Sequence, residues 1–137
     1  MKKTLALVLM ILTVFSMVGI TANATGVEPR WNNTNTATVV LGINSSGKAT
    51  ISYNCMGISS LTTSITAETK LERKWGLLWL DVDGAEWTDT TTNTYLSKTH
   101  NIQLSKTGTY RATTKFTVSG SGGSNDSIKV TSQDTYE

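Results

Sequence analysis

The sequence has little of what usually cross-links or activates a small protein: one cysteine, one proline and one histidine in 137 residues. The single cysteine, Cys55, excludes a disulfide within the chain, so the fold must be held by its apolar core. A hydrolytic triad needs a nucleophile and an orienting acid beside a histidine base, and no Gly-x-Ser-x-Gly motif accompanies His100. We therefore expect His100, in the polar segment 98–101, to be solvated.

An excess of charge is also missing. The chain has 12 basic and 10 acidic residues, and removing Lys2 and Lys3 with the leader described below makes the two numbers equal. Nucleic-acid affinity depends on clustered Lys and Arg, so nucleic acid is not an expected partner. The balanced charge likewise gives no reason to expect an anionic membrane partner.

A long hydrophobic run occurs once, near the N-terminus. Lys2 and Lys3 precede the apolar stretch 5–20, and Ala22-Asn23-Ala24 supplies the small-x-small pattern of a signal peptidase site. We predict a signal peptide over residues 1–24, cleaved after Ala24, in preference to a retained membrane anchor. No later apolar run is long enough to span a bilayer, and no cysteine follows the cleavage site for lipid attachment. The expected product is secreted and extracellular, without a membrane partner after cleavage.

Threonine and serine dominate what remains. Residues 25–137 contain 22 threonines and 13 serines, and threonine suits the exposed positions of a pleated sheet. Apolar residues recur at alternate positions, most clearly from Tyr110 to Val118, where every second residue falls on one face. This pattern predicts an all-β protein: a polar, extended lead-in over 25–35 and a single antiparallel β-sandwich over 36–137.

About seven strands are expected, separated by turn residues. The sequence Asn44-Ser45-Ser46-Gly47 predicts the turn of a hairpin over 36–56, and Asp83-Gly84 is a strong turn pair that should close a short strand. Segment 86–93 reads as a polar connection and tail 132–137 as a fraying end. The strands are expected at 36–43, 49–55, 64–74, 79–82, 95–104, 109–118 and 125–131.

The step Gly108-Thr109-Tyr110 resembles the tyrosine corner of immunoglobulin-like domains, where the tyrosine hydroxyl bonds to the upstream backbone. The resemblance implies an immunoglobulin-like sandwich. Its second cysteine would fall at Ala112, its first could correspond to Cys55 or a neighbour, and its buried tryptophan is most nearly matched by Trp75 or Trp79.

The whole chain after the leader, residues 25–137, also resembles a group of short secreted proteins of unknown function from Gram-positive bacteria. That resemblance implies a fold and an extracellular address, and no active site. It rests on Pro-Arg-Trp-Asn-Asn-Thr at 29–34, Leu-x-Arg-Lys and Leu-Trp-Leu-Asp-Val-Asp-Gly-x-x-Trp between 71 and 87, and Gly-Thr-Tyr-Arg-Ala at 108–112.

Two residue types could carry chemistry. Cys55 continues the alternation of its strand, so we expect a buried, small apolar residue in preference to a nucleophile or an intermolecular disulfide. Four carboxylates lie close together in the sequence and are weak candidates for a calcium site, although the full calcium-loop pattern is absent. They could also form a hydrolase acid and base pair. These residues are Asp81, Asp83, Glu86 and Asp89.

Tryptophans are the best candidates for binding residues, because indole faces stack on sugars and anchor protein contacts. We expect Trp79 in the core and Trp75, beside Gly76, exposed; Trp31 should cover the end of the core or bind. The leading hypothesis is a non-enzymatic secreted domain that needs no cofactor and binds a glycan or protein surface through Trp31, Trp75 and Trp87. The alternatives are a self-associating surface protein and, less favoured, a carboxylate-dependent hydrolase.

Overall fold

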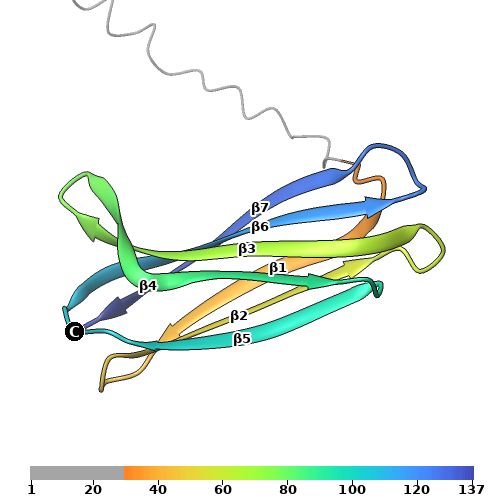
Figure 1. Ribbon diagram of the computed structural model, residues 1–137. Helices are drawn as coiled ribbons and strands as arrows, with labels where there is room; N and C mark the ends of the chain where they lie inside the picture. The colour runs from red at the N-terminus through yellow and green to blue at the C-terminus, as the bar shows by residue number, and fades with distance from the viewer. Residues whose placement is uncertain (1–29) are drawn as a thin grey trace, which may run out of the picture. The chain divides into compact units, whose positions relative to one another are not determined.

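The computed structural model describes residues 30–137, and the predicted signal peptide and residues 25–29 of the lead-in lie outside them. The described chain consists of seven strands and contains no helix, and Figure 1 shows their arrangement. Their bounds are β1 Thr34–Ile43, β2 Lys48–Gly57, β3 Thr62–Trp75, β4 Leu78–Thr91, β5 Tyr95–Gln103, β6 Gly108–Gly120 and β7 Asp126–Tyr136.

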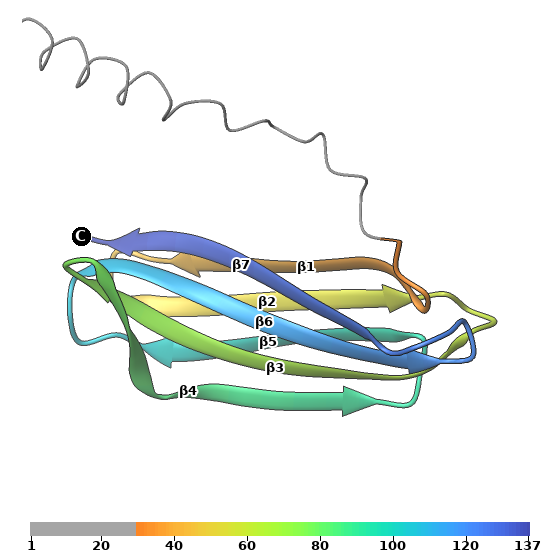
Figure 2. The ribbon, with the colours of Figure 1, turned by 90° about the horizontal axis from the view of Figure 1, so that it is seen from above.

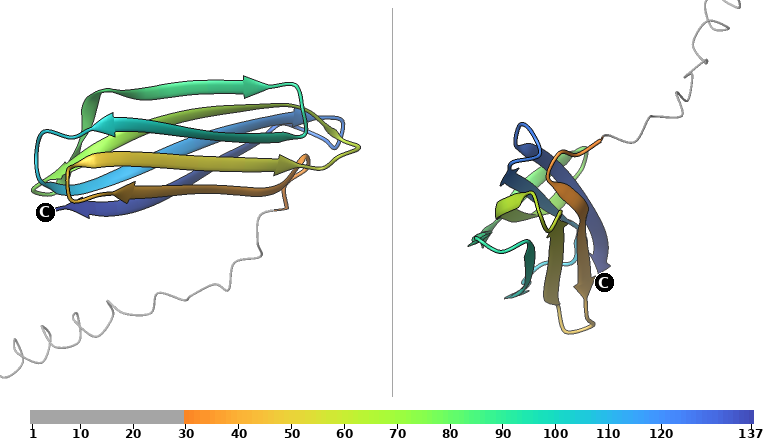
Figure 3. Two further views of the ribbon diagram at one scale, coloured as in Figure 1. Left: turned by 90° about the horizontal axis from the view of Figure 1, so that it is seen from below. Right: turned by 90° about the vertical axis from the view of Figure 1, so that its right-hand side faces the viewer.

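The strands form two antiparallel sheets packed face to face, as Figure 2 and the two views of Figure 3 show. The first sheet has the order β1-β2-β5 and the second the order β4-β3-β6-β7. The predicted all-β sandwich is therefore confirmed, including the hairpin over 36–56, which is built by β1 and β2 in continuous register from Thr36 to Ile43.

Alternate side chains from both sheets fill the core. On β6, every residue of the predicted inward face is buried, from Tyr110 through Phe116 to Val118. Tyr53 from the other sheet meets the ring of Phe116 edge-on at a centroid distance of 6.1 Å. Burial of large side chains of this kind contributes about 1.5–3 kcal/mol each, so the sheets are held together without a cross-link.

The tyrosine-corner hydrogen bond implied by the resemblance is present. Tyr110 lies at the start of β6, and its hydroxyl donates to the carbonyl oxygen of Lys106 at 2.5 Å. Cys55 is a buried free thiol, as predicted. It does not face Ala112, because the Tyr53–Phe116 contact places Cys55 toward Val118, at the other end of β6. Burial and the charge of Asp126 raise the pKa of the Cys55 thiol to about 11.

The Asp83-Gly84 pair does not close a strand, which corrects the sequence prediction. Pairing of β3 with β4 passes from Lys70–Glu86 to Glu72–Asp81, so residues 82–85 form a bulge opposite one residue of β3. Gly84 has φ +72°, the left-handed conformation that the Asp-Gly pair was expected to use. Beyond the bulge the chain continues as a strand over 86–91, where a connection was predicted. Figure 1 shows the bend that the bulge puts into β4.

The C-terminal tail is also a strand and not a frayed end. Strand β7 pairs with β6 as far as Tyr136, and its side chains also bond to the neighbouring edge of β1 in the other sheet. The N–H groups of Leu41 and Ile43 donate to Ser132 Oγ at 3.0 Å and to Asp134 Oδ2 at 2.7 Å. These side chains occupy backbone donors on a sheet edge that would otherwise be open to another chain.

Asp126 secures the other end of the side where β1 lies beside β7, at the start of both strands. Its Oδ1 accepts the N–H of Asn32, and its Oδ2 accepts the N–H of Asn33 and the hydroxyl of Thr34, each at 2.8 Å. Burial alone would raise the pKa of the Asp126 carboxyl, but the hydrogen bonds from the Asn32 and Asn33 backbone outweigh it, and the pKa lies below its ordinary value. The carboxylate thus anchors the lead-in to β7.

We predict that Asp126→Asn lowers the free energy of unfolding by about 2–3 kcal/mol at pH 7, because three donors lose a charged acceptor. Urea unfolding measures the change. Asp83→Asn, at an exposed position, is the matched control and should change stability by less than about 0.5 kcal/mol. Equal stability of the two variants would contradict the anchoring role.

The same interaction sets a pH dependence. A carboxylate with a lowered folded-state pKa stabilises the fold fully above the unfolded value of about 3.9, and this contribution disappears as the pH falls through the folded pKa. The stability difference between wild type and Asp126→Asn should therefore shrink below a pH of about 4. A difference that stays constant down to pH 2 would show that ionisation of Asp126 is not its cause.

Candidate functional site

The exposed large apolar residues gather on one hairpin. Seven such residues are found in the described chain, and four of them lie within residues 75–80, at the β3–β4 turn. Leu77 is 97% exposed, which means that almost none of its side chain touches the protein. The other three are Trp75 at 64%, Leu78 at 58% and Leu80 at 47%.

The local sequence explains why these side chains point into solvent. Trp75 pairs with Leu78, which leaves Gly76 and Leu77 as a two-residue loop. Gly76 has φ +60° and Leu77 does not have a positive φ, a combination that fits a type II′ turn with glycine in the first loop position. Leu77 is then the outermost residue of a tight hairpin. The predicted exposure of Trp75 is confirmed.

A network of charged groups holds the base of this hairpin on the outer face of the second sheet. Arg111 Nε and Nη2 donate to Glu72 Oε2 at 3.0 and 2.7 Å. Lys70 Nζ lies 3.1 Å from Glu72 Oε1 and 3.0 Å from Asp81 Oδ1. Burial would raise the pKa of Glu72, but hydrogen bonds from Arg111 and Lys70 outweigh it and leave the pKa lowered. Two cations thus balance two carboxylates.

Trp79 belongs to this network and not to the core, which corrects the sequence prediction. The guanidinium carbon of Arg111 lies 4.3 Å from the centroid of the half-buried Trp79 ring, a cation–π contact. Trp79 pairs with Lys74 on the same face as Glu72 and Asp81, which is the outer face of the sheet and not the face that covers the core. The sequence run does not show this, because only the pairing with β3 places Trp79 on the face of Glu72, Lys74 and Asp81 and places Leu78 and Leu80 on the other face.

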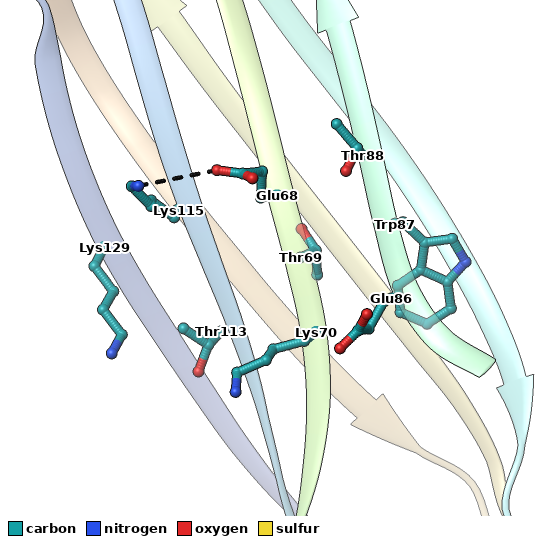
Figure 4. Close-up of a pocket in the computed structure, with 9 residues that line it drawn as sticks. All are labelled: Glu68, Thr69, Lys70, Glu86, Trp87, Thr88, Thr113, Lys115 and Lys129. Carbon is teal, nitrogen blue, oxygen red and sulfur yellow. Dashed lines mark ion pairs between the residues drawn. The ribbon is translucent and has the colours of Figure 1, made fainter. Parts of the chain in front are cut away.

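A groove of about 660 Å³ lies next to the network, on the outer face of the second sheet. Figure 4 shows its lining, in which lysine and glutamate side chains from neighbouring strands are interleaved. Lys115 Nζ and Glu68 Oε2 are 4.0 Å apart, and both side chains are more than half exposed, so this pair contributes little. The mixture of signs gives the groove no evident preference for one charge of ligand.

His100 is half-buried and hydrogen-bonded, so the expectation of a solvated histidine is wrong. Its Nε2 lies 2.7 Å from Asp89 Oδ2 and 3.1 Å from the Tyr53 hydroxyl oxygen, and Tyr53 also donates to Asp89. The ring of Trp87 stacks on His100 at a centroid distance of 4.9 Å. This cluster joins β4 of one sheet to β2 and β5 of the other at the open side of the sandwich.

Electrostatics fit a structural role for the cluster. Burial would raise the pKa of Asp89, but hydrogen bonds from Tyr53 and His100 outweigh it, and the pKa is lowered. Burial and then the bond to Asp89 raise the pKa of Tyr53, so its hydroxyl stays protonated as a donor. Within residues 30–137, Asp89 and Tyr53 are the hydrogen-bond partners of His100 Nε2, and no serine or cysteine of this range bonds to it.

The three predicted binding tryptophans do not form one surface. Trp31 is half-buried and packs against the core at the end of the sandwich near the start of β3. Trp87 is half-buried under its stacking contact with His100, at the middle of β3. Only Trp75 of the three is largely exposed, at the opposite end of β3 from Trp31.

The four predicted acidic residues are separated as well. Asp81 pairs with Lys70 at the hairpin base, and Asp89 bonds to Tyr53 and His100 across the sandwich. Glu86 lines the outer groove, on the face of β4 opposite to Asp89, and Asp83 is exposed in the bulge. Within residues 30–137, no group of three or more His, Cys, Asp or Glu side chains is placed to hold a metal ion.

Comparison of the chain with protein-family models, with curated proteins and with solved structures finds no match. Across the described residues, no helix is long and apolar enough to cross a membrane. The site must therefore be interpreted from its own geometry.

Sequence reasoning missed Leu77, Leu78 and Leu80 as surface residues. It assigned Leu77 and Leu78 to a turn and gave them no role. The available signal was the run Trp-Gly-Leu-Leu-Trp-Leu at 75–80, which interrupts the alternation seen elsewhere in the chain. Apolar residues at consecutive positions of a hairpin occupy both of its faces, and only one face can lie against a core.

We predict that Tyr53→Phe raises the pKa of Asp89 toward its ordinary value, because the carboxylate loses a donor. Carboxyl ¹³C NMR titration measures this shift. The free energy of unfolding at pH 7 should fall by about 1–2 kcal/mol, and the loss should diminish as Asp89 is protonated below a pH of about 4. Tyr95→Phe, at an exposed tyrosine, is the control. An unchanged Asp89 titration in Tyr53→Phe would contradict this account of the cluster.

Proposed function

We propose that this protein is a secreted, non-enzymatic binding module that contacts its partner through the tip of the β3–β4 hairpin, residues 75–80. The observation that carries the proposal is the concentration of exposed Trp75, Leu77, Leu78 and Leu80 on one protruding element. Exposed apolar side chains scattered singly are normal, whereas a contiguous patch marks an interaction site. Export of the chain rests on the signal-peptide pattern of residues 1–24.

The chemistry of the tip favours an apolar partner over a glycan. Sugar recognition uses flat aromatic faces combined with polar groups, and three of the four exposed tip residues are leucines. Trp31 and Trp87, the other aromatic candidates, are engaged in contacts with the core and with His100. We therefore place the contact on Trp75 and the leucines alone, which narrows the set of binding residues expected from the sequence.

The arrangement of the carboxylates supports binding over hydrolysis. A glycosidase needs two carboxyl groups facing one substrate, and Glu86 and Asp89 lie on opposite faces of β4. Asp81 and Asp89 are each committed to a hydrogen-bonded structural contact. These placements offer no shared cleft for an acid and a base.

The proposal predicts that Leu77→Ser combined with Leu78→Ser abolishes retention of the protein on an octyl-coated matrix, while wild type is retained. Stability should change by less than about 0.5 kcal/mol, because the replaced side chains are exposed. Val40→Ser, at an exposed apolar position on β1, is the matched control and should bind like wild type. Equal retention of the double variant and wild type would remove the hairpin tip from the contact.

Self-association through the same tip is the competing explanation for its exposure. Sedimentation velocity over a concentration series distinguishes self-association from binding to another surface. A binding module for another surface stays monomeric at micromolar concentrations. A dimer that the double leucine variant dissociates would make this protein a self-associating one.

A further inference from the structure

We infer that the partner of the hairpin tip is an anionic phospholipid surface, into whose interfacial layer Trp75, Leu77 and Leu78 insert. This inference rests on the proposed function and specifies the chemistry of the surface that the tip contacts. Three features of the hairpin carry it: its convex shape, the order of side chains along it, and the sign of the nearest charges.

The tip is convex and narrow, because a two-residue loop connects its strands. The apolar side chains of such a projection leave water only by inserting into a partner. A protein partner would need a pocket of matching form, whereas the boundary of a bilayer deforms around an inserted side chain. Binding to lipid scales with the apolar area that is inserted, and the almost fully exposed Leu77 offers the most.

The order of residues along the hairpin follows the depth profile of a bilayer. Leu77 is outermost, and aliphatic side chains prefer the hydrocarbon. Trp75 pairs with Leu78 directly behind the loop, and Trp79 pairs with Lys74 one step further back. Tryptophan is enriched at the headgroup level, where its ring is half in and half out of the apolar layer. Leu77 thus lies outermost, the Trp75–Leu78 pair follows, and the two cations come only behind it, in the pairs Lys74–Trp79 and Arg73–Leu80.

The first charges behind the tip are both positive. Lys74 pairs with Trp79 and Arg73 with Leu80, so these two cations come before any carboxylate on either strand. The next pair, Glu72 with Asp81, is acidic, but Lys70 and Arg111 neutralise it. The end of the hairpin is therefore locally basic even though the chain outside the leader has balanced charge. Basic residues near an anionic bilayer strengthen binding by about fivefold each.

The base of the hairpin presents the tip in a defined position. The Arg111–Glu72–Lys70–Asp81 network and the Trp79 ring brace it from the sheet side. Arg73 donates to the carbonyl oxygen of Thr107 through Nε at 3.0 Å and Nη2 at 2.8 Å, which ties the hairpin to the β5–β6 loop. The base of the hairpin is thus already held in place before the tip inserts, which lowers the conformational entropy lost on binding.

The test uses wild-type protein and vesicles of phosphatidylcholine alone or with about 30% of the anionic lipid phosphatidylglycerol. We expect binding to the anionic vesicles, with a blue shift of tryptophan emission, at least about tenfold tighter than binding to the neutral ones. Binding should weaken as salt is raised, because the contribution of Lys74 and Arg73 is screened.

Two variants distinguish insertion of apolar side chains from electrostatic attraction to the bilayer. Leu77→Ser with Leu78→Ser should weaken vesicle binding at least about tenfold at either lipid composition, because two apolar side chains leave the hydrocarbon. Lys74→Glu should reduce the preference for anionic vesicles and leave retention on the octyl matrix unchanged. Val40→Ser and Lys129→Glu, exposed positions away from the tip, are the controls and should bind like wild type.

The outcomes distinguish this inference from the function on which it rests. Wild type that is retained by the octyl matrix through its leucines, but ignores both vesicle types, overturns the lipid partner and keeps the apolar contact. Wild type that binds neither the octyl matrix nor the vesicles overturns both the lipid partner and the apolar contact through the hairpin tip. A dimer in sedimentation velocity that the double leucine variant dissociates identifies a second copy as the occupant and overturns the lipid partner. Vesicle binding that the double variant Leu77→Ser, Leu78→Ser does not weaken also overturns insertion of the tip into lipid.

Discussion

The structure depends on the burial of alternate side chains between two sheets that no disulfide joins. Tyr53 and Phe116 meet at the centre of this contact, and Tyr110 fixes the start of β6 through Lys106. A sandwich without a disulfide also needs its two open sides secured, and polar side chains perform this task differently on each. Asp126, Ser132 and Asp134 of β7 bond to the backbone of the lead-in and β1. On the other side, side chains bond to side chains in the Asp89–His100 cluster.

With both open sides of the sandwich secured, one apolar element of the described chain, the tip of the β3–β4 hairpin, stays exposed. The bulge at residues 82–85 bends β4, and on its loop side Leu78 and Leu80 are exposed, whereas Trp87 on its other side packs against the core. These leucines are strongly apolar, and they are exposed because the bend in β4 places them away from the core. The charge network at the base of the hairpin, with Glu72 buried beneath Arg111, holds this arrangement in place. A rigid support with an apolar end is the physical basis for assigning the hairpin a binding role.

The errors of sequence interpretation have a common origin, which is that local patterns do not report contacts between distant segments. Asp83-Gly84 was expected to close a strand, but a turn and a bulge both use the positive φ of Gly84, and only pairing with β3 distinguishes them. His100 lies in a polar segment, yet Trp87 and Asp89 reach it from another sheet. The tail after Thr131 lacks strong apolar alternation and becomes a strand because β1 and β6 lie beside it.

The sequence by itself determined the fold class, most strand positions, the tyrosine corner, the buried thiol of Cys55 and the exposure of Trp75, because each follows from neighbouring residues and the period of a strand. Tertiary structure alone decided that Trp79 leaves the core, that the four carboxylates are kept apart, and that Leu77 and Leu78 share an exposed tip with basic residues behind it. The physical reason is that burial and charge environment are properties of the surrounding space, which pairing between distant strands creates.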